Sequence, residues 1–325
     1  MKVAITGGGG FLGSRLAQAL LARGQLGGQP ISRLTLLDQA FPGKLEDSRL
    51  RAVSGDIADP QTLANVISED TAAVFHLAAV VSGAAEADFD LGMRANLEGT
   101  RLLLERLRRI SPGGARPPRL VFASSVAAFG GELPAVLDDD TTPMPQTSYG
   151  TQKVIGEYLV SDHSRKGHID GRSLRLPTIV VRAGKPNAAA SSFASGIIRE
   201  PLAGQVSECP VGPQTGVWLL SPRRVLEAFI HAWELPAAAW GARRVLNLPG
   251  IAASVAEMLA ALQRVAGANS ASLVQFKPDA RIQAIVDTWP VRFRTPRALA
   301  MGFRADPDVE AVIRDYVADA GIRLA

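Results

Sequence analysis

A strand, a glycine-rich turn and a helix occupy the first 23 residues, and no other stretch restricts the fold as strongly. Residues 2–6 form a short apolar β run, residues 7–10 are glycines, and residues 14–23 have a helical pattern. Glycines at such a turn allow the backbone to approach a pyrophosphate, and the helix N-terminus offers free N–H groups and a positive dipole. The stretch therefore predicts the first strand and helix of a dinucleotide-binding sheet.

Two glycine templates fit this turn. Gly8, Gly10 and Gly13 match the G-x-G-x-x-G form, whereas Gly7, Gly10 and Gly13 match a wider G-x-x-G-x-x-G form. Glycine spacing alone does not choose between the two. In both cases we expect this segment to bind the cofactor, through the residues Gly7, Gly10, Phe11, Leu12 and Gly13.

Strands and helices continue to alternate as far as residue 181. Further strands are predicted over residues 34–38, 51–57, 72–79, 120–125 and 173–181, and helices over residues 59–68, 89–109 and 149–164. Such alternation produces a parallel sheet with helices on both faces. We predict an α/β fold built on a Rossmann-type doubly wound parallel sheet.

The composition changes after Arg182, where residues 183–216 are small, polar and rich in glycine and proline. Beyond them the pattern predicts helices over residues 193–200, 222–234, 254–266 and 308–320, and strands over residues 244–248 and 273–276. We predict a dinucleotide-binding domain from residues 1–182 with 217–248. A smaller C-terminal α/β substrate-binding lobe is expected from residues 183–216 with 249–325.

Ligands of parallel sheets bind beyond the carboxyl ends of the strands. Residues suited to binding or chemistry lie at these predicted ends, namely Asp38, Asp56, Ala78, Ser125 and Pro177. An acid at Asp38 would accept hydrogen bonds from the adenosine ribose hydroxyls and repel a 2′-phosphate, so it favours NAD over NADP. The alternative is an ordinary aspartate at a turn.

The next two strand ends suggest further cofactor contacts. We expect Asp56 to bond the adenine amino group and Ile57 to pack on the adenine ring. Small residues after the fourth strand leave room for a cofactor, and this segment is Leu77, Ala78 and Ala79. His76 is expected to be a core histidine, and Asn96 is expected to tie its helix to the active site.

Tyr149 and Lys153 are four residues apart, so they lie on one face of a predicted helix. An ammonium at that spacing stabilises a phenolate, and a phenol tuned in this way can accept a proton from an alcohol near neutral pH. Ser125, at the end of the fifth strand, is expected to donate a hydrogen bond to the reacting oxygen. We favour Ser125 over Ser124, which points to the opposite side of an extended segment.

These motifs, in this order, resemble the extended short-chain dehydrogenase/reductase family. The matching segments are residues 6–13, Asp56-Ile57, His76-Leu77-Ala78-Ala79, Ser124-Ser125 with Phe129-Gly130, and Tyr149-x-x-x-Lys153. The resemblance implies a Rossmann fold, NAD as cofactor, and Ser125, Tyr149 and Lys153 as catalytic residues. Ser221-Pro222 departs from the acidic pair often found in sugar-nucleotide epimerases of this family.

A narrower resemblance, to NAD-dependent dehydrogenases of four-carbon sugar acids, rests on residues 80–90 and on residues 184–202. It implies oxidation of a C2 hydroxyl to a 2-keto acid. A small anionic sugar acid needs a cation and hydroxyl-reading groups in its pocket. The candidates, besides Ser125 and Tyr149, are Ser82, Arg182, Lys185, Asn187, Ser191, Ser192 and Arg199. Either Arg182 or Arg199 is expected to bind the carboxylate.

Composition excludes several other classes. Net charge is +4 and there is no run of five like charges, so we expect no nucleic-acid partner. One cysteine and four histidines without ligand spacing give no disulfide and no metal site. No membrane span or signal peptide is apparent, which predicts a cytoplasmic protein. The family resemblance implies a homodimer through the helices beginning near Phe89 and Tyr149.

Two other functions use the same motifs. A nucleotide-sugar epimerase or dehydratase uses the same tyrosine, lysine and NAD, but returns the hydride to the sugar. A redox sensor would bind the dinucleotide without catalysis, although such proteins commonly lose the tyrosine or the lysine. We therefore expect an NAD-dependent dehydrogenase of a small hydroxy acid, with the epimerase as the alternative.

Overall fold

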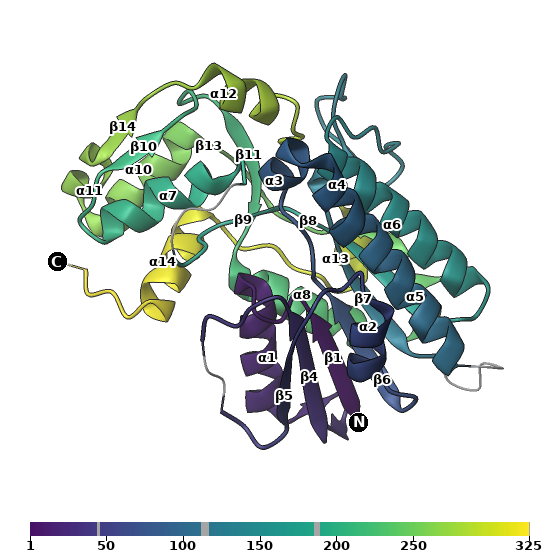
Figure 1. Ribbon diagram of the computed structural model, residues 1–325. Coiled ribbons are helices and arrows are strands. Elements are labelled where there is room, and N and C mark those ends of the chain that lie inside the picture. The colour runs from purple at the N-terminus through teal and green to yellow at the C-terminus, as the bar shows by residue number, and fades with distance from the viewer. Residues whose placement is uncertain (44–45, 112–116, 185–188, 325) are drawn as a thin grey trace. The chain divides into compact units, whose positions relative to one another are not determined.

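A computed structural model of the chain describes residues 1–43, 46–111, 117–184 and 189–324 (Figure 1). The chain divides into two compact units. Unit 1 comprises Met1–Ala128, Thr147–Arg175 and Leu226–Leu246, and unit 2 comprises Phe129–Gln146, Leu176–Val225 and Asn247–Ala325.

A seven-stranded sheet forms the centre of unit 1, with the strand order β12-β8-β7-β6-β1-β4-β5. The strands are β1 Lys2–Thr6, β4 Arg33–Asp38, β5 Leu50–Ser54, β6 Thr71–His76, β7 Arg119–Ser125, β8 Asp170–Leu176 and β12 Val245–Asn247. The pairs of β1 with β4 and β6, of β4 with β5 and of β6 with β7 are parallel. The predicted doubly wound parallel sheet is confirmed, and its strand order reverses at β1.

Helices cover both faces of this sheet. Figure 1 shows α1 on one face and α2, α5 and α6 on the other. The helical elements are α1 Phe11–Arg23, α2 Pro60–Val66, α3 Ser82–Ala87, α4 Phe89–Gly92, the π-helix η1 Met93–Glu98, α5 Gly99–Ile110, the 3₁₀ turn η2 Val126–Ala128, α6 Ser148–Arg165, α8 Pro222–Glu234 and α9 Ala237–Trp240. Their apolar sides meet the sheet in a core that includes Leu63, Leu104 and Val160.

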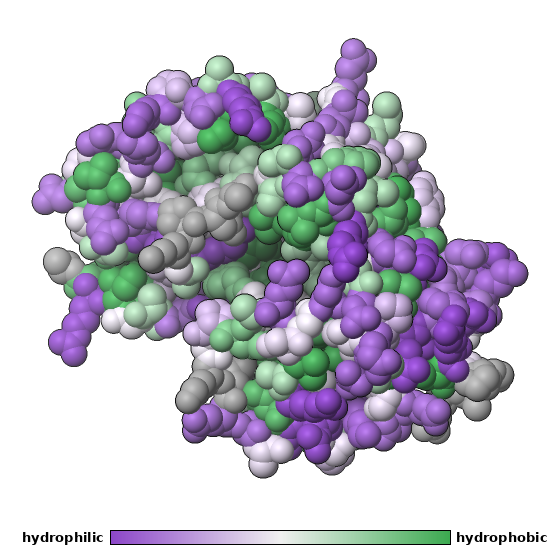
Figure 2. All heavy atoms as spheres, in the orientation of Figure 1, coloured by the Kyte–Doolittle hydropathy of each residue, from purple (hydrophilic) through white to green (hydrophobic). Residues whose placement is uncertain are grey.

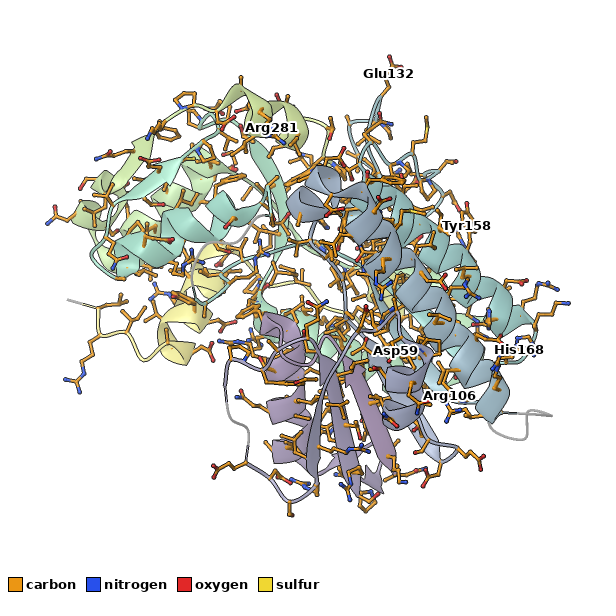
Figure 3. The ribbon with its side chains drawn as sticks, viewed as in Figure 1. Asp59, Arg106, Glu132, Tyr158, His168 and Arg281 are labelled. Atoms are coloured by element: carbon orange, nitrogen blue, oxygen red, sulfur yellow. The ribbon has the colours of Figure 1, made fainter. Side chains whose placement is uncertain are left out.

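Helix starts in unit 1 follow from capping residues. Asp59 accepts hydrogen bonds from the N–H groups of Gln61 and Thr62 at the start of α2, and Pro60 occupies the first helical position (Figure 3). Thr147 accepts from the Gly150 N–H at the start of α6. The outer side of α5 is hydrophilic in Figure 2, since its charged residues form ion pairs such as that of Arg108 with Glu105.

The expected helix over residues 89–109 is interrupted by the π-helix η1. Asn96 lies within η1 and its side chain bonds backbone outside the helix, while the Thr100 hydroxyl donates to the Asn96 carbonyl at 2.6 Å. After α1 the chain also forms a two-stranded sheet of β2 Gln25–Leu26 and β3 Gln29–Pro30, which the sequence pattern does not predict. Apolar periodicity reports which face is buried, so it does not detect either feature.

Unit 2 is built on two small sheets. The three-stranded sheet has the order β13-β11-β9, and β10 pairs with β14. The elements are β9 Thr178–Ile179, α7 Ser192–Leu202, β10 Ser207–Cys209, β11 Gly216–Leu220, β13 Ile251–Ser254, α10 Val255–Ala266, α11 Ala268–Ser272, β14 Val274–Phe276, α12 Ala280–Val286, α13 Pro296–Ala300 and α14 Val309–Asp319. Its core joins α7, α10 and α14 through residues such as Ile197, Met258 and Ile313.

The strand predicted over residues 173–181 is wrong as a single element. β8 ends at Leu176, and β9 pairs in parallel with β11 in the sheet of unit 2. Pro177 separates the two strands. Proline has no N–H to donate to a ladder and restricts the preceding residue, so the chain leaves the first sheet there.

Candidate active site

The turn after β1 contains glycines that differ in whether a larger residue could replace them. Gly7 has φ +75°, and a Cβ on it would lie 2.7 Å from the Ala78 backbone nitrogen. A Cβ on Gly13 would lie 2.0 Å from the Gly7 carbonyl oxygen. Gly10 has no such obstruction, since its nearest neighbour would be the Gly7 oxygen at 3.3 Å. The turn therefore packs against the end of β6 and leaves its outer side open at Gly10.

Helix α1 begins directly beyond this turn. Gly10 is its N-cap residue, and neither a side-chain cap nor an acidic residue occupies its first turn. The N–H groups of a first helical turn lack partners within the helix, so they are available to an anion. Phe11 and Leu12 open the helix half-buried, with the Arg15 guanidinium 4.8 Å from the centre of the Phe11 ring.

Asp38 ends β4 beside the glycine turn. Its Oδ2 accepts a hydrogen bond from the Gly9 N–H at 2.9 Å, and its Oδ1 accepts from the Gln39 N–H at 2.7 Å. A carboxylate therefore lies next to the glycine turn, as a ribose-binding acid must. The structure brings Asp38 and the turn together as the sequence pattern predicted.

Asp56 and Ile57 follow β5, not within it as predicted, because the strand ends at Ser54. The Arg94 side chain donates to Asp56 Oδ2 at 2.6 Å, and the Ala58 N–H donates to Oδ1 at 2.8 Å. Burial alone would raise the pKa of Asp56, but these bonds lower it. Ile57 is only 8% exposed and belongs to the core of unit 1.

The end of β6 lies at the point where the strand order reverses. Leu77, Ala78 and Ala79 are half-buried there, and the Leu77 N–H donates to the Thr6 carbonyl at 3.0 Å. His76 is completely buried between the hydroxyls of Thr6 and Thr100, at 2.6 and 2.8 Å. Burial lowers the pKa of His76 to about 3, so it is the neutral core histidine that we expected.

Asn96 connects three elements around the same point. Its Oδ1 accepts from the Val80 N–H at 2.7 Å, and its Nδ2 donates to the Val80 carbonyl at 3.1 Å and to Gln152 Oε1 at 2.7 Å. Its side chain therefore joins η1 to the segment after β6 and to α6. The amide holds the backbone in place around the site.

Tyr149 and Lys153 lie on one face of α6, one turn apart. The Lys153 nitrogen is 5.5 Å from the centre of the Tyr149 ring, and it donates to the Ala123 carbonyl at 2.9 Å. The Lys153 side chain is 3% exposed, whereas Tyr149 is half-buried. Burial lowers the pKa of Lys153 to about 8, and the charge of Glu157 opposes this shift.

The two serines at the end of β7 have different surroundings. Ser124 is 1% exposed and donates its hydroxyl proton to Glu157. Ser125 is half-buried, and its Oγ accepts from the Ala127 N–H at 3.1 Å. The Ser124 hydroxyl thus already donates its proton within the core, while the Ser125 hydroxyl proton can be directed to a substrate oxygen.

The predicted substrate residues are divided between the units. Ser82 opens α3 in unit 1, while Arg182, Ser191, Ser192 and Arg199 belong to unit 2. Pro177, which was predicted as a cofactor contact, also belongs to unit 2. Lys185 and Asn187 lie outside the described residues. Within unit 2, Arg182 Nη2 donates to Ser191 Oγ at 3.1 Å, and Arg199 Nη1 donates to the Arg182 carbonyl at 2.6 Å.

A family model described as the NAD dependent epimerase/dehydratase family matches residues 3–238. The chain belongs to this family. The match spans the glycine turn, Asp38, Ser125 and the Tyr149–Lys153 helix face. NAD is therefore its cofactor, and unit 1 fits NAD because a glycine cradle, an uncapped helix start and a carboxylate adjoin one another.

Relatives within the family match the chain over nearly its whole length. A D-erythronate dehydrogenase of Cupriavidus necator is 56% identical over 326 residues, 99% of each chain. One of Haemophilus influenzae is 45% identical over 318 residues, 98% of this chain and 99% of the relative. Among solved structures, a protein described as a nucleoside-diphosphate-sugar epimerase from Agrobacterium tumefaciens has 40% identity and a TM-score of 0.95, covering 100% of this chain and 96% of its own.

Several residues around Tyr149 and Lys153 were absent from the sequence-based prediction of the site. Glu86 on α3 accepts the Ser148 N–H at 2.9 Å and so fixes the start of α6. Glu157 and Arg175 form a buried ion pair at 2.7 Å behind Lys153. The position of Glu157 four residues after Lys153 could have identified it, because this spacing places it on the same helix face.

Two negative findings concern the described part of the chain. No helix there combines the length and apolarity that a membrane crossing requires. No cluster of three or more histidine, cysteine, aspartate or glutamate side chains in those same residues could hold a metal ion.

Proposed function

We propose that this enzyme oxidises the C2 hydroxyl of a small sugar acid with NAD⁺, and that D-erythronate is its substrate and 2-dehydro-D-erythronate its product. The observation that carries the proposal is the pair of full-length relatives named D-erythronate dehydrogenase, at 56% and 45% identity. The chain retains Ser125, Tyr149 and Lys153, and their presence supports catalysis over passive cofactor binding. The earlier narrower resemblance in residues 80–90 and 184–202 is to the same enzyme.

In this proposal Tyr149 is the general base that accepts the proton of the C2 hydroxyl. The buried Lys153 ammonium stabilises the resulting phenolate, and Ser125 donates a hydrogen bond to the oxygen that becomes the carbonyl. Bound NAD⁺ supplies the acceptor for the C2 hydride. The protein must present the alcohol to Tyr149 and Ser125 together, which their positions on adjacent elements allow.

The cofactor is assigned to the strand ends of unit 1. The glycine turn and the start of α1 suit the pyrophosphate, and Asp38 suits the adenosine ribose. Asp56 and Ile57 are assigned to the adenine, and Lys153 also to the nicotinamide ribose. The remaining proposed contacts are Leu77, Ala78, Ala79, Asn96, Tyr149 and Pro177.

Unit 2 is proposed as the substrate-binding lobe, and its arginines differ in a way that favours one of them. Arg199 is 8% exposed, donates to the Arg182 carbonyl at 2.6 Å and forms an ion pair with Glu200 at 2.6 Å. Its charge is already neutralised. Arg182 is half-buried, and its Nη2 donates to the Ser191 hydroxyl at 3.1 Å. Because Arg199 is held by Glu200, we assign the substrate carboxylate to Arg182, with Arg199 supporting the Arg182 backbone.

Replacing Arg182 tests this assignment. Arg182→Met is expected to raise KM for D-erythronate by about 10–100-fold, since a charged hydrogen-bond pair contributes about 1.5–3 kcal/mol. Affinity for NADH, measured by fluorescence titration, should be unchanged. Arg281→Met, at an exposed arginine of α12 in the same unit (Figure 3), is the matched control. An unchanged KM in Arg182→Met would contradict the assignment.

The substrate itself is tested by a panel of four- to six-carbon aldonates and uronates, scored by NADH formation. We expect the highest kcat/KM with D-erythronate and little activity with six-carbon acids. UDP-sugars belong in the same panel, because the Agrobacterium tumefaciens protein is described as an epimerase. Epimer exchange of a UDP-sugar, without NADH formation from any acid, would favour that second function.

We infer a homodimer formed through helices α4 and α6. Both carry large apolar side chains that are exposed in the single chain, with Phe89 60%, Leu91 40% and Tyr158 67% exposed. Tyr158 lies on the outer side of α6 in Figure 3. Exposed apolar residues grouped on adjoining helices suit a partner surface. Light scattering should give twice the mass of one chain, and a monomer would contradict the inference.

The proposed location is the cytoplasm. The single cysteine, Cys209, is buried, and burial raises the pKa of its thiol. A reducing compartment suits a protein with this cysteine usage. Cell fractionation with an antibody against the chain tests the location.

A further inference from the structure

Helix α6 carries a buried carboxylate behind the catalytic face. Glu157 is 3% exposed, and it follows Lys153 by four residues and Tyr149 by eight. All three side chains therefore lie along one stripe of the helix. A buried carboxylate is unfavourable unless partners compensate for its lost hydration.

Two residues compensate for the burial of Glu157. The Ser124 hydroxyl donates to Glu157 Oε1 at 2.5 Å. Arg175, on β8, donates from Nε to Oε1 at 2.8 Å and from Nη2 to Oε2 at 2.7 Å. Both carboxylate oxygens thus accept charge-assisted bonds from a bidentate guanidinium. We call Ser124, Glu157 and Arg175 the Glu157 cluster.

The Glu157 cluster joins the two elements that carry the catalytic residues. On β7, the Ala123 carbonyl accepts from Lys153, and the next residue, Ser124, donates to Glu157. The residue after that is Ser125. Two consecutive strand residues therefore hold α6 in register, and a shift of the helix would move Tyr149 and Lys153 relative to Ser125.

The charges around Lys153 give the cluster a second role. Tyr149 and Glu157 face Lys153 from its own helix, and neutral His76 adjoins it from β6. Arg175 on β8 is already paired with Glu157. Burial lowers the pKa of Lys153, and Glu157 is the group whose charge raises it. Without that anion, Lys153 would lose its proton at a lower pH.

We propose that Glu157 is a positioning residue that holds α6 in register with Ser125 and keeps Lys153 charged beside Tyr149. The inference rests on the proposed function for the catalytic roles of Tyr149 and Lys153, although it does not depend on which alcohol is oxidised. A buried ion pair is not needed for stability alone, because well-packed apolar residues often serve as well or better. We therefore attribute the position of this ion pair behind Lys153 to its effect on Tyr149 and Lys153.

The first test reads the Tyr149 phenol directly and needs no substrate. The chain has three tyrosines, so Tyr158→Phe with Tyr316→Phe leaves Tyr149 as the only ionising phenol. Its titration is followed by the ultraviolet difference absorbance of phenolate. Adding Glu157→Gln is expected to raise the midpoint by about one pH unit, because a neutral Lys153 no longer stabilises the phenolate. An unchanged or lowered midpoint would overturn the electrostatic role.

Asp170→Asn in the same two-substitution background is the matched control. Asp170 forms a buried ion pair with Arg172 at 2.7 Å, at the opposite end of β8. Its loss should reduce stability without moving the Tyr149 midpoint. An equal shift in both variants would show that any disturbed ion pair of this strand produces the effect, and would overturn the specific role of Glu157.

Ser124→Ala tests the register and keeps every charge, so it remains informative if Glu157→Gln does not fold. We expect kcat to fall about tenfold with unchanged NADH affinity and substrate KM. A C2-deuterated substrate should show a larger isotope effect on kcat than in the parent enzyme, because the chemical step becomes slower. A kcat and isotope effect equal to the parent's would overturn the positioning role. If no tested acid is oxidised, the proposed function fails. The phenol titration still tests the role of Glu157 in that case, because it needs no substrate.

Discussion

Tyr149→Phe is expected to reduce kcat for D-erythronate oxidation by about 10³-fold, within the range typical of a lost general base. Phenylalanine preserves the ring that lies 5.5 Å from the Lys153 nitrogen, so the packing of α6 should not change. It removes the hydroxyl that we propose as the acceptor of the substrate proton. The dissociation constant of NADH should therefore stay the same while turnover is lost.

Steady-state rates and NADH fluorescence measured on one preparation test this expectation. Tyr158→Phe is the matched control, because Tyr158 is on the same helix and is 67% exposed. It should retain parent turnover. If Tyr149→Phe kept more than about one tenth of the parent kcat, a different group would have to accept the proton.

Lys153→Met should lower kcat by a similar factor, about 10³-fold, and should also make the protein more stable at neutral pH. Methionine has nearly the length of lysine and no charge, so it suits a site that is 3% exposed. Loss of the ammonium removes the stabilisation of the phenolate. A gain in stability together with a loss of turnover would indicate that the buried Lys153 charge serves catalysis at a cost in stability.

The sign of the stability change follows from the pKa of Lys153. Burial lowers that pKa from 10.5 to about 8 in the folded protein. Between these values the unfolded chain binds more protons, so the free energy of unfolding of the parent rises with pH. Lys153→Met should lack this rise and should be more stable below pH 8, by up to about 3 kcal/mol.

Urea denaturation at several pH values measures this difference. The bond from Lys153 to the Ala123 carbonyl, 2.9 Å long, offsets part of the gain. Lys166→Met, at the exposed C-terminal end of α6, is the control and should reproduce the parent's pH dependence. A parent whose stability is flat across that pH range would mean that Lys153 is not buried in its charged form.

The fold could be predicted from the sequence where local pattern and tertiary packing agree. The first strand, the glycine turn and the α6 helix are of this kind, because apolar period and glycine spacing directly reflect burial. The break at Pro177 could be read locally, but the pairing of β9 with β11 depends on contacts distant in sequence. The π-helix around Asn96 depends on a side chain bonding backbone sixteen residues away.

The candidate site was predictable to a similar extent. Ser125, Tyr149 and Lys153 follow from residue type, spacing and position at strand ends, and the structure places them on adjoining elements. The preference for Ser125 over Ser124 gains support from the bond of Ser124 to Glu157. Glu157 could have been identified from its spacing to Lys153, but its bonds from Arg175 on β8 join residues distant in sequence and could not be foreseen. Arg182 and Arg199 look alike in sequence, and only their contacts distinguish them.

The fate of the C2 hydrogen of D-erythronate tests the central claim most directly. D-Erythronate deuterated at C2 is incubated with the enzyme and NAD⁺, and the cofactor and the acid are separated and analysed by mass spectrometry. We predict that one deuterium is transferred to the reduced cofactor and that the acid becomes 2-dehydro-D-erythronate. Deuterium retained in the acid, with no reduced cofactor formed, would contradict the assignment as a D-erythronate dehydrogenase.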